Sequence, residues 1–308
     1  MPMEILLANP RGFCAGVNRA IAIVHQALER YRPPVYVLHE IVHNTHVIEE
    51  LRQRGAVFVE ELEEIPEGAV TIFSAHGVSR AVEERAKELG LRTIDATCPL
   101  VSKVHRRMIR LHAHGYDVLV IGHKGHPEVE GTCGQAEGPV HVLSKPAEIE
   151  ALQVADPARV GYVTQTTLSV DDTAELLQAL RARFPQISEP ERTDICYATT
   201  NRQAAVRQLA DAVDLVLIVG SKNSSNSNRL REVAELRHTP AYLIDDASEI
   251  DPHWLTGAKR VGISAGASAP EHLVVEVVNW LQRQGAGTVI EMTGEEEHIN
   301  FLVPDLDV

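Results

Sequence analysis

Short apolar runs alternate with amphipathic stretches along the whole chain. The runs lack a strict polar–apolar alternation, which is typical of parallel strands buried on both faces. Between them, stretches such as residues 15–28 and 80–89 carry apolar residues at helical spacing, and Gly90 ends the second one. The expected strands include residues 5–8, 35–38, 57–59, 70–73, 92–97, 140–143, 241–244 and 289–292. Four more segments with apolar runs begin at residues 117, 159, 214 and 260, and these strands end at polar residues in 123–128, 166–167, 224–226 and at 268. This order predicts an α/β protein built on parallel sheets.

The order of elements repeats three times, which divides the chain into α/β segments at residues 1–96, 97–194 and 195–308. We expect three similar parallel-sheet units, packed compactly in a pseudo-threefold trefoil because no Pro/Gly/Ser-rich linker separates them. Three separate units in a row are the alternative. After its last strand the chain continues as an acidic tail, and this last strand is expected to pair with the unit that holds the N-terminal strand.

Each segment carries one cysteine where a strand passes into a helix. Cys98 follows a β-branched run and precedes Pro99, which suits the first turn of a helix. Cys14 follows the apolar run at residues 5–8, and Cys196 follows a short stretch at residues 193–195 that we expect to be a strand. A thiolate is favoured at the donor end of a helix. Cys133 matches no such junction and is interpreted as a spectator.

Composition and charge narrow the possible partners. The chain of 308 residues has a net charge of −14 and no concentrated lysine/arginine cluster, which argues against nucleic acid. No apolar run reaches the length of a membrane span, and the N-terminus lacks the features of a signal peptide, so a cytoplasmic location is expected. Four cysteines without a C-x-x-C pair indicate metal binding, catalysis or core packing rather than disulfides.

Polar residues gather where the expected strands end. Because ligands bind at the carboxyl ends of strands in such sheets, these residues are the candidate binding groups, and a threefold packing would turn them toward one centre. The run at residues 221–228 also offers hydroxyl, amide and backbone donors before a helix, which suits an anion. The candidates are His43, His76, His126, Glu128, Thr166, Ser224, Asn226 and Ser268. Eight further histidines are expected at the surface: His25, His105, His112, His114, His238, His253, His272 and His298.

Three converging thiolates favour an iron–sulfur cluster over zinc. A zinc site would need a fourth ligand, for which no residue has suitable spacing. A 4Fe-4S cluster held by three cysteines leaves one iron open to a substrate.

Nine motifs, in order, resemble the 4-hydroxy-3-methylbut-2-enyl diphosphate reductase family. They are RGFCAGVNRA, VHN, SAHGVS, DATCPLV, GHPEVEGT, QTTLSVDDT, ICYATTNRQ, GSKNSSNSNRL and AGASAP. The resemblance implies a trefoil of three α/β domains around one oxygen-sensitive 4Fe-4S cluster per chain. It further implies an oxidoreductase that reductively dehydroxylates (E)-4-hydroxy-3-methylbut-2-enyl diphosphate to isopentenyl and dimethylallyl diphosphate, the last step of the methylerythritol phosphate isoprenoid pathway.

The resemblance also assigns roles. Cys14, Cys98 and Cys196 match the cluster ligands, Glu128 the proton donor, and Thr166 the residue that orients the substrate hydroxyl. The diphosphate-binding positions match His43, His76, His126, Ser224, Asn226 and Ser268, with Ser225 beside them. No dinucleotide fingerprint such as GxGxxG is present, so electrons are expected from a ferredoxin or flavodoxin.

Two other classes of protein stay open at this point. A quinolinate-synthase-like dehydratase would share a three-cysteine cluster, but it should bind carboxylates through arginines rather than His, Ser and Asn. A non-catalytic iron–sulfur sensor would need a partner surface, whereas the polar candidates here all follow strand ends.

Overall fold

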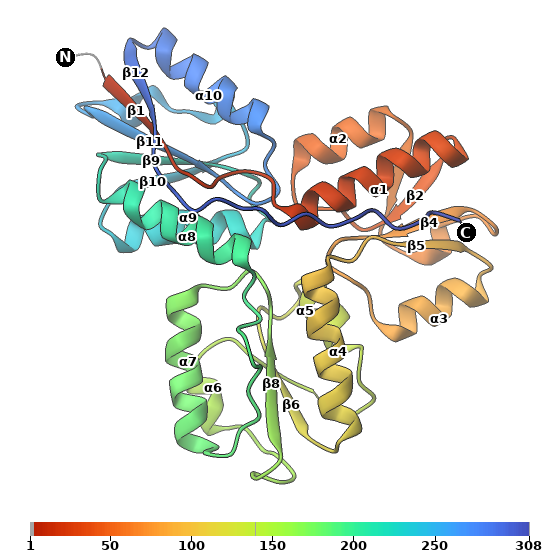
Figure 1. Cartoon of the computed structure of the whole chain (residues 1–308). Coiled ribbons are helices and arrows are strands. Elements are labelled where there is room, and N and C mark those ends of the chain that lie inside the picture. Colours follow the sequence, from red (N-terminus) through yellow and green to blue (C-terminus); the bar gives the residue numbers. More distant parts are fainter. Residues whose placement is uncertain (1–2, 139, 308) are drawn as a thin grey trace. The chain divides into compact units, whose positions relative to one another are not determined.

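A computed structural model describes residues 3–138 and 140–307 of the chain. Within them, three parallel sheets confirm the predicted α/β fold with three parallel-sheet units (Figure 1). Contacts group the chain into two compact units. The one-sheet unit comprises the N-terminal segment up to Asn18, His43–Glu50 and Tyr197–Asn300, and the two-sheet unit comprises Arg19–Val42, Leu51–Cys196 and the segment from Phe301. Each unit is described by itself.

The one-sheet unit contains a five-stranded parallel sheet with strand order β10-β9-β11-β1-β12. Its strands are β1 (Met3–Leu7), β9 (Leu215–Val219), β10 (Ala241–Ile244), β11 (Arg260–Ala265) and β12 (Ala286–Glu291). Its other elements are α8 (Tyr197–Ala210), α9 (Ser225–Leu236), α10 (Glu271–Arg283) and the 3₁₀ turns η2 (Ala247–Glu249) and η3 (Pro252–Leu255). Helix α1 (Ala15–Tyr31) begins in this unit, as does α2 (Thr45–Gln53).

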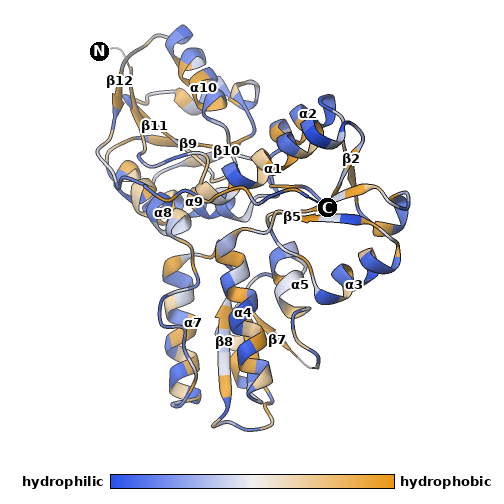
Figure 2. Ribbon diagram, turned by 45° about the vertical axis from the view of Figure 1, so that its right-hand side comes forward, coloured by the Kyte–Doolittle hydropathy of each residue, from blue (hydrophilic) through white to orange (hydrophobic). Residues whose placement is uncertain are grey.

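Alternate residues of the central strands bury against helices on opposite faces of this sheet. Leu217 packs in a cluster with Val274 and Leu281 of α10, whereas Val216 packs in a separate cluster with Leu209 of α8. Successive side chains of a strand point to opposite faces, so β9 is apolar at every position and wholly buried. This explains why the sequence shows unbroken apolar runs (Figure 2).

The two-sheet unit contains a four-stranded sheet of order β3-β2-β4-β5 and a three-stranded sheet of order β7-β6-β8, both parallel. The four-stranded sheet consists of β2 (Val35–Leu38), β3 (Ala56–Val59), β4 (Val70–Phe73) and β5 (Arg92–Asp95), with η1 (Leu62–Glu64) and α3 (Arg80–Glu88) in the connections. The three-stranded sheet consists of β6 (Asp117–Ile121), β7 (His141–Leu143) and β8 (Val160–Thr164), with α4 (Pro99–Ala113), α5 (Pro127–Cys133), α6 (Ala147–Glu150) and α7 (Val170–Arg183).

Strand β1 lies outside the sheet of its own sequence segment. The division at residues 96 and 194 groups it with β2–β5, but it pairs with β11 and β12, both of the third segment. The expected pairing of the C-terminal strand with the N-terminal one is confirmed, with Ile5 opposite Val289. A parallel strand can pair with any partner that a long crossover brings beside it, so local sequence does not decide its sheet.

The expectation of a strand at residues 193–195 is wrong. These residues have no strand, and only an isolated bridge joins Ser188 to Gly161 of β8. Pro190 and four charged residues at positions 189–194 explain this, because proline lacks the N–H that a ladder requires. The segment is instead fixed by side chains, since Arg107 donates to the Ser188 carbonyl at 2.9 Å and Lys103 pairs with Asp194 at 3.3 Å.

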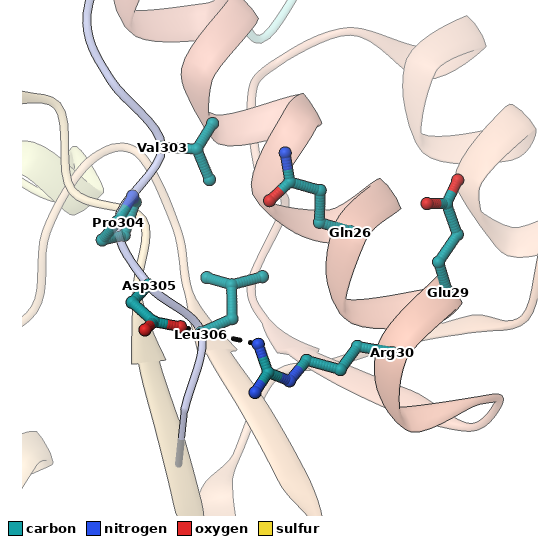
Figure 3. Close-up of a pocket in the computed structure, with 7 residues that line it drawn as sticks. All are labelled: Gln26, Glu29, Arg30, Val303, Pro304, Asp305 and Leu306. Carbon is teal, nitrogen blue, oxygen red and sulfur yellow. Dashed lines mark hydrogen bonds and ion pairs between the residues drawn. The ribbon is translucent and has the colours of Figure 1, made fainter.

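Beyond β12 the chain continues through residues 292–307 without helix or strand, as the expected tail. In the two-sheet unit this tail passes along α1, where Leu306 is buried and the Tyr31 hydroxyl donates to its carbonyl. Asp305 lies 3.5 Å from the Arg30 guanidinium (Figure 3). The tail and α1 line a pocket formed by Gln26, Glu29, Arg30, Val303, Pro304, Asp305 and Leu306. No predicted site residue lines it.

Candidate active site

The predicted junction at Cys98 is confirmed. Cys98 is the N-cap of α4 and Pro99 occupies the first turn. Its backbone N–H donates to the Ala75 carbonyl at 3.0 Å, which ties the cysteine to the residue before His76. The helix therefore begins at the thiol, as proline at the first helical position favours.

Cys14 and Cys196 immediately precede α1 and α8 and are tied to candidate loops in the same way. The Cys14 N–H donates to the Ala267 carbonyl at 3.2 Å, and Ala267 precedes Ser268. The Cys196 N–H donates to the Thr166 carbonyl at 3.0 Å. All four cysteines, including Cys133, are described by the structure and are partly exposed thiols outside any disulfide. Three of them thus share one backbone arrangement, with each N–H bonded to a loop that carries a predicted substrate-binding residue.

The side chains of Glu128 and Thr166 form a buried pair in the two-sheet unit. The Glu128 carboxylate is 3% exposed and accepts hydrogen bonds from the Thr166 N–H at 2.6 Å and the Thr166 hydroxyl at 3.0 Å. Burial raises the pKa of Glu128 to about 7; the two bonds from Thr166 oppose this shift, and the negative charge of Asp194 adds to it. At neutral pH this carboxyl group can both hold and release a proton.

His126 and His76 adjoin this pair. His126 is the N-cap of α5, and its Nδ1 accepts from the Glu128 N–H at 3.2 Å. In a neutral ring this contact leaves the proton on Nε2, where it can be donated to an anion. The His76 ring meets the His126 ring edge to face with centroids 5.8 Å apart, and His76 Nδ1 lies 3.2 Å from the Ser74 hydroxyl. Two imidazoles thus lie beside the buried carboxyl group of Glu128.

The remaining candidates lie together in the one-sheet unit. Asn226, 4% exposed, accepts from the Ala267 N–H at 2.8 Å through Oδ1. Its Nδ2 is buried and has no hydrogen-bond partner within the described chain. The Ser268 hydroxyl donates to the His43 carbonyl at 2.9 Å, and Ser224 caps α9, of which Ser225 is the first residue. A buried amide N–H without an acceptor is costly, so this site fits a ligand that supplies one.

Two glycines make room for the first turn of α9. A Cβ on Gly220 would lie 2.2 Å from the Ser227 hydroxyl, and one on Gly266 would lie 2.0 Å from it. Ser227 is fully buried and donates to the Ser224 hydroxyl at 3.0 Å. The glycines of the GSKNSSNSNRL and AGASAP motifs are therefore required by close packing beneath the candidate anion site.

The structure corrects the expectation for His105 and adds residues that the sequence did not reveal. His105 is 9% exposed rather than at the surface, and burial lowers its pKa to about 4. A Cβ on Gly77 would lie 2.7 Å from the His105 ring.

Asp194 and Arg202 are buried charges that sequence reasoning missed. Asp194 lies two residues before Cys196, and this proximity is the only sequence signal that could have singled it out.

The predicted residues fall into two groups. Cys14, His43, Ser224, Ser225, Asn226 and Ser268 belong to the one-sheet unit, and Cys98, Cys196, His76, His126, Glu128 and Thr166 belong to the two-sheet unit. In the described part of the chain, no three His, Cys, Asp or Glu side chains lie in a metal-ligating arrangement. Joint ligation by the three cysteines therefore stays a prediction.

Comparison with known proteins decides the family. A family model described as LytB protein matches residues 5–282. The chain belongs to the LytB protein family. LytB relatives named 4-hydroxy-3-methylbut-2-enyl diphosphate reductase include one from Idiomarina loihiensis, 58% identical over 98% of this chain and 97% of its own, and one from Bordetella pertussis, 59% identical over 98% and 93%.

A solved LytB-like structure agrees with the fold. The E-1-hydroxy-2-methyl-but-2-enyl-4-diphosphate reductase from Plasmodium falciparum is 38% identical, with a TM-score of 0.93 over 98% of this chain and 96% of the other. In the described residues of this LytB protein, no helix has both the length and the apolar character to span a bilayer.

Proposed function

We propose that this LytB protein is an iron–sulfur oxidoreductase that converts (E)-4-hydroxy-3-methylbut-2-enyl diphosphate to isopentenyl and dimethylallyl diphosphate. This is the last step of the methylerythritol phosphate route to isoprenoids. Family membership over nearly the whole chain supports the reaction. The observation that carries the chemistry is the buried Glu128–Thr166 pair, because a carboxyl group with a pKa of about 7 can deliver the proton that dehydroxylation requires.

We propose one 4Fe-4S cluster per chain, with Cys14, Cys98 and Cys196 as its ligands. The donor chemistry fits, since three partly exposed thiols each precede a helix and have the same backbone anchoring. Ala15, next to Cys14, also donates its N–H to the hydroxyl of Tyr197, next to Cys196, at 3.2 Å. When bound, the cluster supplies electrons and a Lewis-acidic iron to the substrate.

The diphosphate is bound by neutral or protonated histidines together with Ser and Asn donors. The Asn226 Nδ2, buried without an acceptor in the described chain, is the best-supported donor. Ser224 and Ser225 directly precede Asn226, and Ser268 follows Ala267, whose N–H donates to the Asn226 Oδ1. His43, His76 and His126 complete the set, and His126 donates from Nε2 because Nδ1 already accepts a bond from Glu128. Hydrogen bonds to the charged phosphate oxygens are worth about 1.5–3 kcal/mol each.

Glu128 holds the reacting proton. With its pKa raised to about 7, a large fraction of Glu128 is protonated at neutral pH, and a protonated carboxyl group can donate to the leaving hydroxyl. Thr166 positions that carboxyl through two hydrogen bonds and is itself joined to Cys196 through its carbonyl. Its hydroxyl is also the group that orients the substrate's hydroxyl.

We further propose that the enzyme works in the cytoplasm with a ferredoxin or flavodoxin as electron donor. The sequence contains no dinucleotide fingerprint, so electrons must arrive from another protein. The net charge of −14 agrees with a small-molecule substrate and not with a nucleic acid.

The direct test is turnover by the anaerobically purified, chemically reduced protein incubated with the allylic diphosphate. Both isopentenyl and dimethylallyl diphosphate are expected, identified by mass spectrometry after phosphatase treatment. Iron and sulfide are measured in the same sample. Protein that contains a full cluster but forms neither product would refute the proposed reaction, and catalytic amounts of product without a cluster would refute the cofactor.

A further inference from the structure

Arg202 is a fully buried arginine directed at the loop that precedes Cys14. It lies in α8, and its side chain is 1% exposed. Its Nε and Nη2 donate to the Gly12 carbonyl at 2.9 and 2.8 Å, and Nη2 also lies 3.3 Å from the Phe13 carbonyl. Its Nη1 donates to the Ala198 carbonyl at 3.1 Å within the same helix. The planar guanidinium group therefore holds the carbonyl groups of Gly12 and Phe13, the two residues before Cys14.

Glu297, from the stretch after β12, neutralises this buried charge. Its Oε1 lies 2.9 Å from Arg202 Nη1 and its Oε2 lies 3.2 Å from Nη2, which is a two-point ion pair. The Asn201 amide adds a bond to Oε1 at 3.1 Å, and the Glu297 side chain is only 15% exposed. Without Glu297 the guanidinium would be a buried charge without a counter-charge, a strongly unfavourable state.

The chain on the other side of Cys14 is held by the same helix. Tyr197, the first residue of α8, accepts the Ala15 N–H through its hydroxyl at 3.2 Å. Arg202 thus fixes the residues before Cys14, and Tyr197 fixes the residue after it. Gly12 has φ near +67°, and a Cβ added to it would lie 3.3 Å from the Ala269 carbonyl oxygen. The loop is tightly constrained on both sides of the thiol.

We propose that Arg202 and Glu297 are a positioning pair that holds the Cys14 thiol ready for cluster binding, so that the C-terminal stretch contributes to the cluster site. The inference rests on the proposed ligation by Cys14. It goes beyond that function by assigning a role to two residues that are neither proposed cluster ligands nor proposed substrate-binding groups. Because α8 begins immediately after Cys196, one helix would fix the backbone beside two of the three ligands.

The test uses the full chain with Glu297→Gln and Arg202→Lys, which keep side-chain size or charge. The matched control is Asp211→Asn, which weakens the exposed Arg237–Asp211 pair in the same unit, where both N–O distances are below 3 Å. The first measurement is the alkylation rate of each cysteine in the apo-protein, followed by mass spectrometry. Cys133 serves as the internal reference. The second is iron and sulfide content with the electronic spectrum after anaerobic reconstitution.

In Glu297→Gln and Arg202→Lys we expect the Cys14 alkylation rate, relative to Cys133, to change by about tenfold, the ratio equivalent to one charge-assisted hydrogen bond. Reconstituted cluster should be lost or converted to a form with less iron. Glu297→Asp, which keeps the charge, should recover part of the cluster content. Asp211→Asn should match the unmodified protein in both measurements.

Two results would overturn the positioning role. One is an alkylation rate of Cys14 that is unchanged in both variants, with full cluster content. The other is an equal rise in the alkylation rate of all four cysteines, which would indicate general loosening of the fold. Should Arg202→Lys fail to fold, Glu297→Gln decides alone. The apo-protein rates do not depend on ligation, so a Cys14→Ser variant that keeps its cluster would refute the proposed ligand set separately.

Discussion

At the scale of single residues, the decisive feature is a carboxyl group whose environment and position suit proton transfer. Glu128 lies two residues after His126, so one short stretch carries both an imidazole and an acid. Burial raises the pKa of Glu128 to about 7, against a pKa of about 4.5 for an exposed glutamate. The hydrogen bonds from Thr166 oppose part of this rise in pKa, so the Glu128 carboxyl group can both keep and release a proton near neutral pH.

Replacing Glu128 by glutamine should stop proton delivery while keeping the shape of the site. We expect an intact cluster and near-normal substrate binding, with turnover lower by about 10² or more, the usual worth of general acid catalysis. Single-turnover kinetics of the pre-reduced enzyme measure this effect. Glu130→Gln, an exposed position on the same helix, is the control and should react at the unmodified rate. Product release from Glu128→Gln at that rate would exclude Glu128 as the donor.

The same pKa shift predicts how stability depends on pH. Because the folded-state pKa lies above the unfolded value, the folded protein binds more protons between about pH 4.5 and 7, and this residue lowers stability as pH rises through that window. Above this pH window, the free energy of unfolding is lowered by an amount on the order of 3 kcal/mol. The free energy of unfolding, measured with denaturant, should therefore differ between Glu128→Gln and the unmodified protein by an amount that grows with pH. A difference independent of pH would contradict the burial argument.

At the scale of elements, helix starts carry most of the candidate chemistry. Cys98 caps α4, His126 caps α5 and Ser224 caps α9, while Cys14 and Cys196 directly precede α1 and α8. All but Cys196 follow a parallel strand, at the end of a sheet where ligands commonly bind. The first turn of α9 adds Asn226, whose Nδ2 has no protein acceptor in the described chain.

Removing the Asn226 amide should weaken anion binding without disturbing the helix. Asn226→Ala is expected to reduce affinity for inorganic diphosphate by roughly tenfold or more, the worth of one charge-assisted hydrogen bond, measured by titration calorimetry. Asn223→Ala changes an exposed amide in the same loop and should leave the affinity unchanged. Equal affinities for both variants would place the diphosphate elsewhere.

At the scale of the whole molecule, the predicted ligands come from distant parts of the chain. Cys14 belongs to the one-sheet unit, and Cys98 and Cys196 belong to the two-sheet unit. A single cluster would need all three, so each is expected to be indispensable. Cys133 is not expected to share this role, because it matches no strand-to-helix junction, and burial raises its pKa to about 11.

Replacing Cys14, Cys98 or Cys196 by serine should therefore abolish most of the brown chromophore and the activity, since a hydroxyl oxygen is a poor ligand for this soft site. Absorbance and iron content after anaerobic reconstitution report the loss. Cys133→Ser is the matched control and should keep both. A colourless Cys133→Ser protein beside a coloured Cys98→Ser protein would reverse the assignment.

The sequence by itself determined most of the elements and the strand-to-helix junctions at Cys14 and Cys98, but not the one expected at Cys196. The strand at residues 35–38, the strand at residues 70–73 and the helix that begins at Pro99 all appear where the pattern predicts them. These features depend on near neighbours: proline suits a first helical turn, and unbroken apolar runs suit strands buried on both faces. The sequence also indicated Glu128 and Thr166 by their positions after expected strands, and the family motifs added their roles.

Only the tertiary structure decided which distant residues meet. The sheet that β1 joins, the burial of His105 and the contact between Glu128 and Thr166, 38 residues apart, could not be read from the pattern. Arg202 and Glu297, 95 residues apart, look like ordinary surface charges in the sequence. Propensity acts over a few residues, whereas burial, pKa and pairing depend on what packing brings together, and packing is a property of the folded chain.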